Sequence, residues 1–182
     1  MNLLIVRLGA LGDIVHAIPA AAALRAALPG ARIDWLVEAK HRAIIDLVTA
    51  VDRVVPLERP TIRGWADVVR RARQVRYDVA FDFQGLMKSA VLARASGAAR
   101  VAGFSIWHLR EKTARPFYSE TAAAAEDDGG HVIQKNLHLL RVVGIEASPV
   151  EFPIADVSSR ALDEVRDQVG PDAFALINPG AA

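Results

Sequence analysis

Short apolar runs alternate with helix-like segments along this chain, and this alternation limits the fold more than any other feature. Six runs have the length and composition of buried strands, at 2–7, 32–37, 53–56, 79–83, 100–102 and 173–178. Segments with helical character occupy residues 14–28, 41–50, 61–75, 87–96, 132–143 and 159–168. Strands that alternate with helices favour a parallel sheet with right-handed crossovers. We therefore predict an α/β fold, a Rossmann-like parallel sheet flanked by helices.

The last part of the chain predicts the start of a second unit. Residues 159–168, followed by Gly170 and Pro171, have the character of a connector, and the strand-like run 173–178 precedes Pro179 and Gly180. A length of 182 residues suits one domain together with the beginning of another. We expect a Rossmann-like domain over residues 1–155 and, over 156–182, a connector and the first strand of a truncated second domain.

Composition excludes several classes of protein. The chain has no cysteine, which excludes disulfides and cysteine-bound zinc and favours a cytoplasmic location. The longest apolar stretch, residues 14–27, is interrupted by His16, Pro19 and Arg25, so it is too broken to span a bilayer. Arg7 lies inside the first apolar run, which argues against a secretory signal. A net charge of +1 gives no reason to expect nucleic acid as a partner.

The turn after the first predicted strand carries the most distinctive polar residue. Residues 9–13 read Gly-Ala-Leu-Gly-Asp, which is neither a G-x-G-x-x-G dinucleotide fingerprint nor a phosphate-binding P-loop. The arrangement places Asp13 at the carboxyl end of a strand, the edge where open α/β sheets bind ligands. Two interpretations stay open and are compatible: Asp13 caps the following helix, or it is a carboxylate at the rim of a crevice.

A second strand end repeats this layout. Gln84 and Gly85 turn the chain out of the strand 79–83, and Lys88 falls in the first turn of the next predicted helix. Lys88 is therefore placed either to reach an anionic ligand in the crevice beside Asp13 or to face solvent.

Basic residues gather in two groups. Six arginines and one acid lie between residues 59 and 76, and a second group comprises Arg100, Arg110, Lys112 and Arg115. The helical arginines 70–76 are typical of a solvated face. Arg59 and Arg63 lie in a connection instead, where we expect them to point at a ligand, because guanidinium groups suit phosphates and carboxylates.

Several other polar and aromatic residues favour packing over chemistry. We interpret His16 as a packed or capping residue, and His131 and Asn136 as residues that order the start of a helix. The segment 119–130 lacks an apolar period and is predicted to be a mobile loop. Core or rim packing is the favoured interpretation of the aromatic residues near the arginines, Trp65, Trp107, Phe117 and Tyr118.

Four segments in this order resemble the heptosyltransferases of glycosyltransferase family 9, above all the heptosyltransferase I branch. They are residues 5–16 (IVRLGALGDIVH), 34–38 (DWLVE), 84–90 (QGLMKSA) and 110–118, which begins REK and ends FY. The resemblance runs from residue 1 to about residue 144. Beyond residue 144 only the connector and residues 178–180 (Asn-Pro-Gly) still resemble the family. The Asn-Pro-Gly segment is similar to the opening of the family's second domain.

The resemblance implies a GT-B enzyme, in which two Rossmann-like domains face each other across a cleft. The N-terminal domain of such enzymes binds the Kdo-modified lipid A acceptor, and the C-terminal domain binds the ADP-heptose donor. Transfer inverts the anomeric centre without metal or cofactor, and residues 126–128 (Glu-Asp-Asp) do not match an Asp-x-Asp metal motif. A lipid-linked acceptor implies peripheral contact with the cytoplasmic face of the inner membrane.

The resemblance also assigns roles to residues. The base would be Asp13, and the acceptor's anionic groups would bind Lys88 and Arg110 and, in a segment that departs from the family pattern, Arg63 and Arg59. The donor loop would consist of Gly9, Ala10 and Gly12, with Gly9 and Ala10 standing where some relatives have hydroxyl residues.

Other functions remain open at this point. One is a family 9 enzyme with a different acceptor, of the heptosyltransferase II type. Another is a nucleotide-binding Rossmann module of a different class, such as an oxidoreductase domain, although the missing glycine fingerprint counts against it. A third is a non-catalytic binding module. As a heptosyltransferase fragment, the chain is expected to transfer no sugar by itself.

Overall fold

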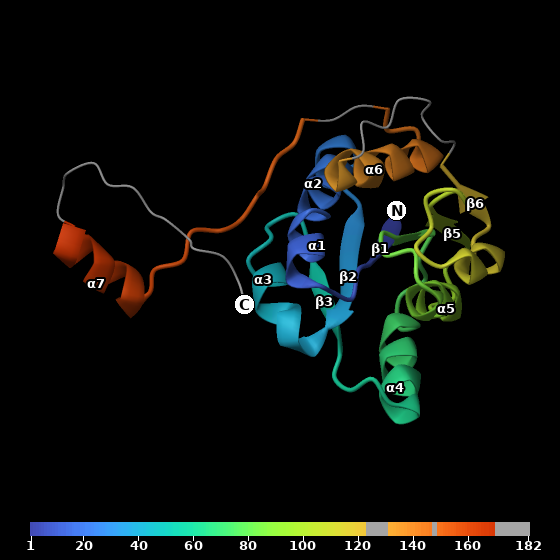
Figure 1. The fold of residues 1–182 in the computed structure, drawn as a ribbon, viewed down its shortest axis with the longest axis horizontal. Helices are drawn as coiled ribbons and strands as arrows, with labels where there is room; N and C mark the ends of the chain where they lie inside the picture. The colour runs from blue at the N-terminus through green and yellow to red at the C-terminus, as the bar shows by residue number, and fades with distance from the viewer. Residues whose placement is uncertain (123–130, 147–148, 170–182) are drawn as a thin grey trace.

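A computed structural model of the chain describes residues 1–122, 131–146 and 149–169. Within these residues six strands form one parallel sheet in the order β3-β2-β1-β4-β5-β6 (Figure 1). This confirms the predicted α/β fold. The strands are β1 (Asn2–Val6), β2 (Arg32–Glu38), β3 (Arg53–Leu57), β4 (Val79–Asp82), β5 (Arg100–Gly103) and β6 (Glu120–Thr121).

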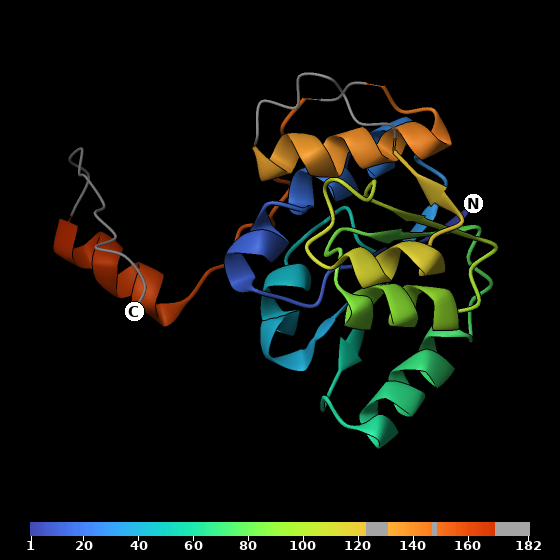
Figure 2. The same cartoon turned by 45° about the vertical axis from the view of Figure 1, so that its right-hand side comes forward.

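Helices cover both faces of the sheet, as Figure 2 shows. Side chains alternate along a strand, so in β1 Leu3 and Ile5 pack into one core while Leu4 and Val6 pack into the other. The first core includes α2 (Ile18–Ala27) and α6 (Val132–Leu139), and the second includes α4 (Ile62–Ala72) and α5 (Met87–Ala95). Burial on both faces explains why the strands are continuous apolar runs.

The first predicted helix, 14–28, is divided in two. It begins earlier than expected as α1 (Leu11–Val15) and resumes as α2, in which Pro19 occupies the first turn. Proline is tolerated there because the first amides of a helix have no partner within the helix. The consequence for the site is that residues 11–15 form a separate short turn of helix.

The remaining helices agree with the sequence to different degrees. The predicted helix 41–50 is largely wrong, because only η1 (Ala39–His41) and α3 (Arg42–Ile45) form there. Those at 61–75, 87–96 and 132–143 are confirmed as α4, α5 and α6, the last extended by η3 (Leu140–Val143). The helix at 159–168 is α7 (Arg160–Val169), and η2 (Lys112–Phe117) was not predicted.

One loop expectation is wrong in part. Strand β6 forms at the start of the predicted mobile loop 119–130, where Glu120 makes an ion pair with Arg100 and β6 extends the sheet beyond β5. Residues 123–130, which include the acidic run 126–128, and the predicted strand 173–178 lie outside the described residues.

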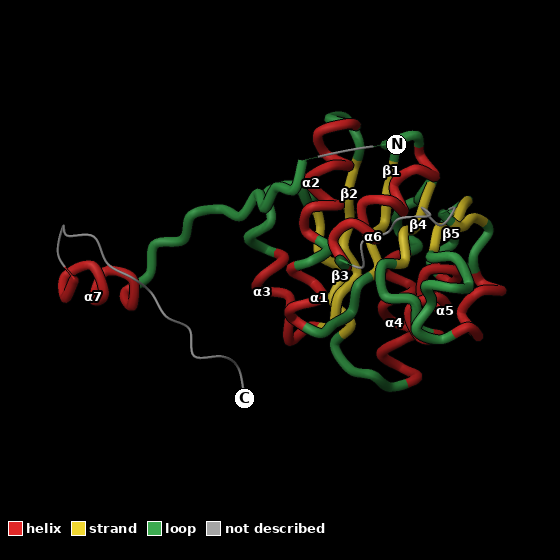
Figure 3. Tube along the Cα trace, turned by 45° about the horizontal axis from the view of Figure 1, so that its top comes forward, coloured by secondary structure: helices red, strands yellow, loops and turns green. Residues whose placement is uncertain are grey.

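Helix α7 lies apart from the sheet and its covering helices (Figures 1 and 3), and none of its residues is buried. The division into a domain at 1–155 and a connector at 156–182 stays a prediction. Over residues 1–122, 131–146 and 149–169, no helix has the length and apolar character needed to cross a membrane.

A buried carboxylate fixes the turn that follows β4. Asp82 is fully buried and accepts hydrogen bonds from the Tyr118 hydroxyl (2.7 Å), the Ser89 hydroxyl (2.9 Å) and the backbone amide of Gln84 (2.9 Å). The turn continues through Gly85, whose φ of +69° favours glycine. Burial raises the pKa of Asp82, and the hydrogen bonds oppose that rise.

We expect Tyr118→Phe to lower the free energy of unfolding by about 2 kcal/mol, because it leaves a buried carboxylate with one donor fewer. Urea unfolding of the 182-residue chain measures this loss.

Tyr77→Phe is the matched control. The Tyr77 hydroxyl also donates to a buried carboxylate, that of Asp34 (2.7 Å), but Asp34 keeps ion pairs with Arg32 (2.9 Å) and Arg53 (2.8 Å). The loss should be about half as large, near 1 kcal/mol. Equal losses for the two variants would contradict this account of Tyr118.

Candidate functional site

The candidate site lies where the strand order of the sheet reverses, between β1 and β4. Chain connections leave this point in opposite directions, and open α/β sheets bind ligands in the crevice that results. The loops after the two strands are joined: the backbone amide of Leu8 donates to Oε1 of Gln84 (2.8 Å), and that of Phe83 donates to the carbonyl of Val6 (3.1 Å). The turn after β4, which Asp82 fixes, is therefore hydrogen-bonded to the loop after β1 that leads to Asp13.

Asp13 is paired with two arginines from different parts of the chain. Its carboxylate forms ion pairs with Arg7 and, over 3.3 Å to Oδ2, with Nη2 of Arg110. The capping interpretation is wrong, because the N-cap position of α1 is Ala10 and no side chain caps that helix. The structure thus brings together two predicted site residues, Asp13 and Arg110, that are 97 positions apart.

Arg7 belongs to the candidate site although the sequence indicated no role for it in binding or catalysis. Its side chain is 3% exposed, and Nη1 donates to the carbonyl of Phe83 at the end of β4 (2.5 Å). Burial lowers the pKa of Arg7, and the charge of Asp13 opposes that effect. A positive residue directly after a buried strand was the signal that could have identified it.

Lys88 lies at the same edge of the sheet but pairs with a different carboxylate. Its Nζ is 3.4 Å from Glu38, at the end of β2, and Glu38 also pairs with Lys40 (3.0 Å). Burial acts to raise the pKa of Glu38, but Lys40 and Lys88 together lower it. No direct contact joins Lys88 to Asp13 among the described residues.

The residues predicted to form the donor loop, Gly9, Ala10 and Gly12, lie in the loop after β1 and in the short helix α1. A side chain at Gly9 would come within 3.3 Å of the His41 ring and 3.9 Å of Glu38, so the loop passes close to both. Ala10 and Gly12 are exposed, and open space surrounds Gly12.

Arg59 and Arg63 are not brought to Asp13. Both are exposed, and neither forms an ion pair with another described residue. Arg59 lies on the connection between β3 and α4, but the expectation that Arg63 also lies in a connection is wrong, because α4 begins at Ile62 and Arg63 is in its first turn. The two arginines line a separate open hollow together with Glu58, Thr61, Ile62, Gly64 and Asp67.

The residues predicted to pack do so around the site. The rings of His16 and His131 meet edge to face at 5.8 Å, and Nδ2 of Asn136 donates to the His16 carbonyl (2.9 Å). His131 also caps α6 through Nδ1, which accepts from the amide of Ile133 (3.3 Å). Trp107 differs from the packing expectation, since it is 81% exposed.

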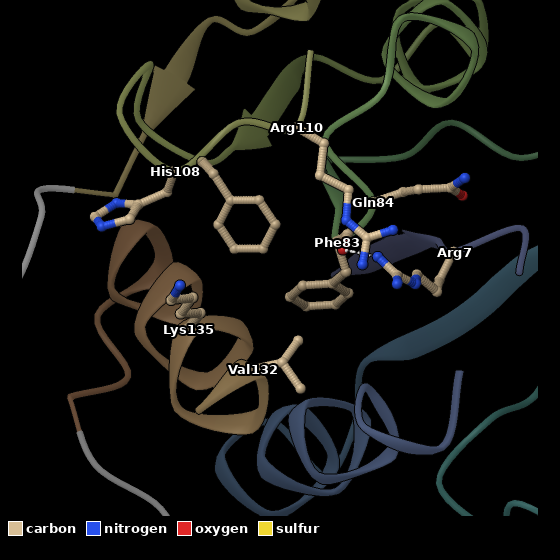
Figure 4. Close-up of a pocket in the computed structure, with 8 residues that line it drawn as sticks. Arg7, Phe83, Gln84, His108, Arg110, Val132 and Lys135 are labelled. Carbon is tan, nitrogen blue, oxygen red and sulfur yellow. Dashed lines mark hydrogen bonds between the residues drawn. The ribbon is translucent and has the colours of Figure 1, made fainter. Parts of the chain in front are cut away.

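A cavity of about 230 Å³ opens beside the Asp13 ion pairs (Figure 4). Sequence reasoning missed most of its lining, because α6 and the loop after β5 supply side chains with no motif of their own. The lining residues are Arg7, Phe83, Gln84, Phe104, His108, Arg110, Val132 and Lys135.

The acidic and histidine side chains of the described segments form no group of three or more that could hold a metal ion. What the site offers is one partly buried carboxylate, a set of cations and a sugar-sized hollow. This arrangement suits proton transfer from a ligand that carries negative charge.

Comparison with known proteins places this chain in a family. Residues 65–182 match the sequence profile of glycosyltransferase family 9 (heptosyltransferase). Lipopolysaccharide heptosyltransferase 1 of Pseudomonas aeruginosa is 33% identical over 192 residues, covering 100% of this chain and 50% of that protein. The protein of the same name from Escherichia coli K12 is 31% identical over 152 residues, covering 76% of this chain and 46% of that protein.

A solved heptosyltransferase structure is also similar to this chain. The structure described as E. coli heptosyltransferase WaaC with ADP superposes with a TM-score of 0.72 and 28% identity, covering 85% of this chain and 51% of that one. The chain thus spans about half the length of the relatives it matches. Sequence and structure agree that this chain belongs to glycosyltransferase family 9, the heptosyltransferase family.

Proposed function

We propose that this chain is the acceptor-binding part of an inverting, metal-independent heptosyltransferase I, which moves heptose from ADP-heptose to the Kdo of the lipopolysaccharide inner core. The observation that carries the proposal is the Asp13 carboxylate, held by Arg7 and Arg110 at the switch point of a family 9 fold. The similarity to proteins named lipopolysaccharide heptosyltransferase 1 supports the choice of acceptor.

In this proposal Asp13 is the general base. The acceptor hydroxyl oxygen forms a bond to the anomeric carbon of heptose while the bond from that carbon to the phosphate oxygen breaks, and ADP leaves with the electron pair. The hydroxyl proton passes to the Asp13 carboxylate. The ion pairs to Arg7 and Arg110 orient the carboxylate toward the crevice, so the base is in place before the acceptor enters.

The cations at this edge serve the acceptor, which carries several negative charges. Arg110 and Lys88 are partly exposed, at 58% and 44% of their side chains, and each pairs with one carboxylate that an anionic ligand could replace. Arg59 and Arg63 would bind a more distant anionic group of the acceptor, because they line a hollow of their own.

The donor would be held mainly by sequence that the matched relatives have and these 182 residues do not cover. One structural neighbour is described with ADP and another with ADP-2-deoxy-2-fluoro heptose, which supports a nucleotide-sugar donor. Gly9, Ala10 and Gly12 would let the donor approach the backbone closely. The acceptor is lipid-linked, so the enzyme would work in the cytoplasm and touch the inner membrane peripherally.

Asp13→Asn, made in the full reading frame that contains these residues, should reduce turnover about a hundredfold or more because the general base is lost. Heptose transfer to Kdo-lipid A, measured at saturating donor and acceptor, checks this. Asp46→Asn is the control, since Asp46 pairs with Arg42 on an exposed helical turn. A wild-type rate in the Asp13 variant would remove this residue from the mechanism.

Lys88→Gln should raise the KM for the acceptor about tenfold with a smaller effect on kcat, since a charge-assisted contact to bound substrate is lost. Lys40→Gln is matched to it, because Lys40 pairs with the same Glu38 carboxylate but is more exposed. Similar KM values for both variants would show that Lys88 does not bind the acceptor.

The 182-residue chain by itself should bind the acceptor weakly and transfer no heptose, because the donor needs the other half of the cleft. The full reading frame should use Kdo-lipid A that carries no heptose. Transfer only to an acceptor that already carries the first heptose would replace this proposal with a heptosyltransferase II function.

A further inference from the structure

A carboxylate from the loop after β5 reaches the start of the helix that carries Lys88. Oε2 of Glu111 accepts a hydrogen bond from the backbone amide of Met87 (2.7 Å), the first residue of α5. The backbone amide of Glu111 also donates to the carbonyl of Gly85 (3.1 Å). Helix η2, which begins directly after Glu111, lies alongside α5 (Figure 2). The loop after β5 is therefore fixed to the first turn of α5.

This contact joins two pairs of consecutive residues, each of which carries one cation of the candidate site. Arg110 directly precedes Glu111 and forms the ion pair with Asp13 over 3.3 Å. Lys88 directly follows Met87. The hydrogen bond from Met87 to Glu111 thus links the backbone beside one cation to the backbone beside the other.

Neither cation is held firmly by its own side chain. The Lys88 ammonium lies 3.4 Å from Glu38, which is long for an ion pair, and 44% of the side chain is exposed. The Arg110 side chain is 58% exposed. Exposed ion pairs contribute little free energy, since water screens them and two long side chains must be ordered. The positions of both cations therefore depend on the backbone that carries them.

Capping explains why the Glu111 carboxylate turns back onto the protein. Glu111 is exposed and forms no ion pair with a described residue. Leu86, the N-cap residue of α5, has no side-chain oxygen, so a carboxylate from outside the helix accepts from the first helical amide instead. The positive end of the helix dipole also favours a negative charge at this place.

We propose that Glu111 is a positioning residue, which keeps Lys88 at a set distance from the Asp13–Arg110 ion pair. This inference rests on the proposed function, in which Lys88 and Arg110 bind the acceptor that delivers its hydroxyl to Asp13. Glu111 contacts neither substrate nor base in this arrangement and acts through the backbone amide of Met87. With that amide held, one acceptor molecule can meet both cations without a further loss of conformational freedom.

Glu111→Ala, made in the full reading frame, removes the acceptor of this hydrogen bond. We expect the KM for Kdo-lipid A to rise about fivefold to tenfold with little change in kcat, because Lys88 loses its fixed place while the base stays paired. Glu111→Gln keeps a side-chain oxygen that can accept from Met87, so its KM should stay within about twofold of wild type. Equal increases in the two variants would assign the effect to the charge of Glu111 and overturn the proposal.

A double-mutant cycle separates positioning of Lys88 from a merely structural role. In a protein that already carries Lys88→Gln, Glu111→Ala should raise the KM by about twofold or less, since the side chain it positions is gone. If the two single-variant effects multiply instead, Glu111 acts independently of Lys88 and the proposal is wrong.

Ser159→Ala is the matched control for loss of a helix cap. The Ser159 hydroxyl accepts from the backbone amide of Leu162 (3.2 Å) in α7, which lies apart from the sheet. This variant should leave the KM for Kdo-lipid A unchanged. A KM increase as large as that of Glu111→Ala would attribute both effects to helix capping in general, against the proposal.

Hydrogen exchange supplies a measurement that needs no activity. The segment 87–91 of the full protein should exchange about threefold to tenfold faster in Glu111→Ala than in wild type or Glu111→Gln. Unchanged exchange would contradict the role of Glu111 whatever the enzyme does. Faster exchange, together with no heptose transfer by the unmodified protein, would contradict the proposed function alone and leave Glu111 as the residue that positions the backbone of Lys88.

Discussion

The buried guanidinium of Arg7 is the interaction on which the site depends. It directly follows β1, donates to the carbonyl of Phe83 directly after β4 and pairs with Asp13 on α1, so one side chain links three elements. Burial alone would make such a charge costly. The cost is tolerated because a carbonyl and a carboxylate face it, and the same arrangement keeps Asp13 at the rim of the crevice.

A second buried network makes this junction rigid. The carboxylate of Asp82 accepts hydrogen bonds from the hydroxyls of Ser89 and Tyr118 and from the backbone amide of Gln84. The side-chain oxygen of Gln84 in turn accepts from the backbone amide of Leu8. The turn after β4 and the loop after β1 therefore cannot move independently. Under the proposed function this coupling is useful, because a base at Asp13 and the cations proposed to bind the acceptor would have to keep one spacing during the reaction.

Local sequence patterns predicted the longer strands of the sheet well and the short helices and strands poorly. The strand from 2 to 7 was predictable because burial on both faces leaves an unbroken apolar run. The helix expected at 41–50 shortened to α3 because the apolar residues after Ile45 pack as a turn rather than as a helix face. Strand β6 has two residues and was not predicted, since its pairing with β5 and the ion pair of Glu120 with Arg100 are tertiary contacts that no local pattern shows.

The sequence by itself determined the parallel α/β fold, the family and the position of Asp13 after the first strand, because these follow from local periodicity and short motifs. Only the tertiary structure decided what surrounds that carboxylate. Arg110 reaches it from 97 residues away, and His108 and Lys135 line one cavity with Arg7 only because the loop after β5 and helix α6 converge on one edge of the sheet. Such contacts depend on how the elements pack, and no local pattern in the chain encodes them.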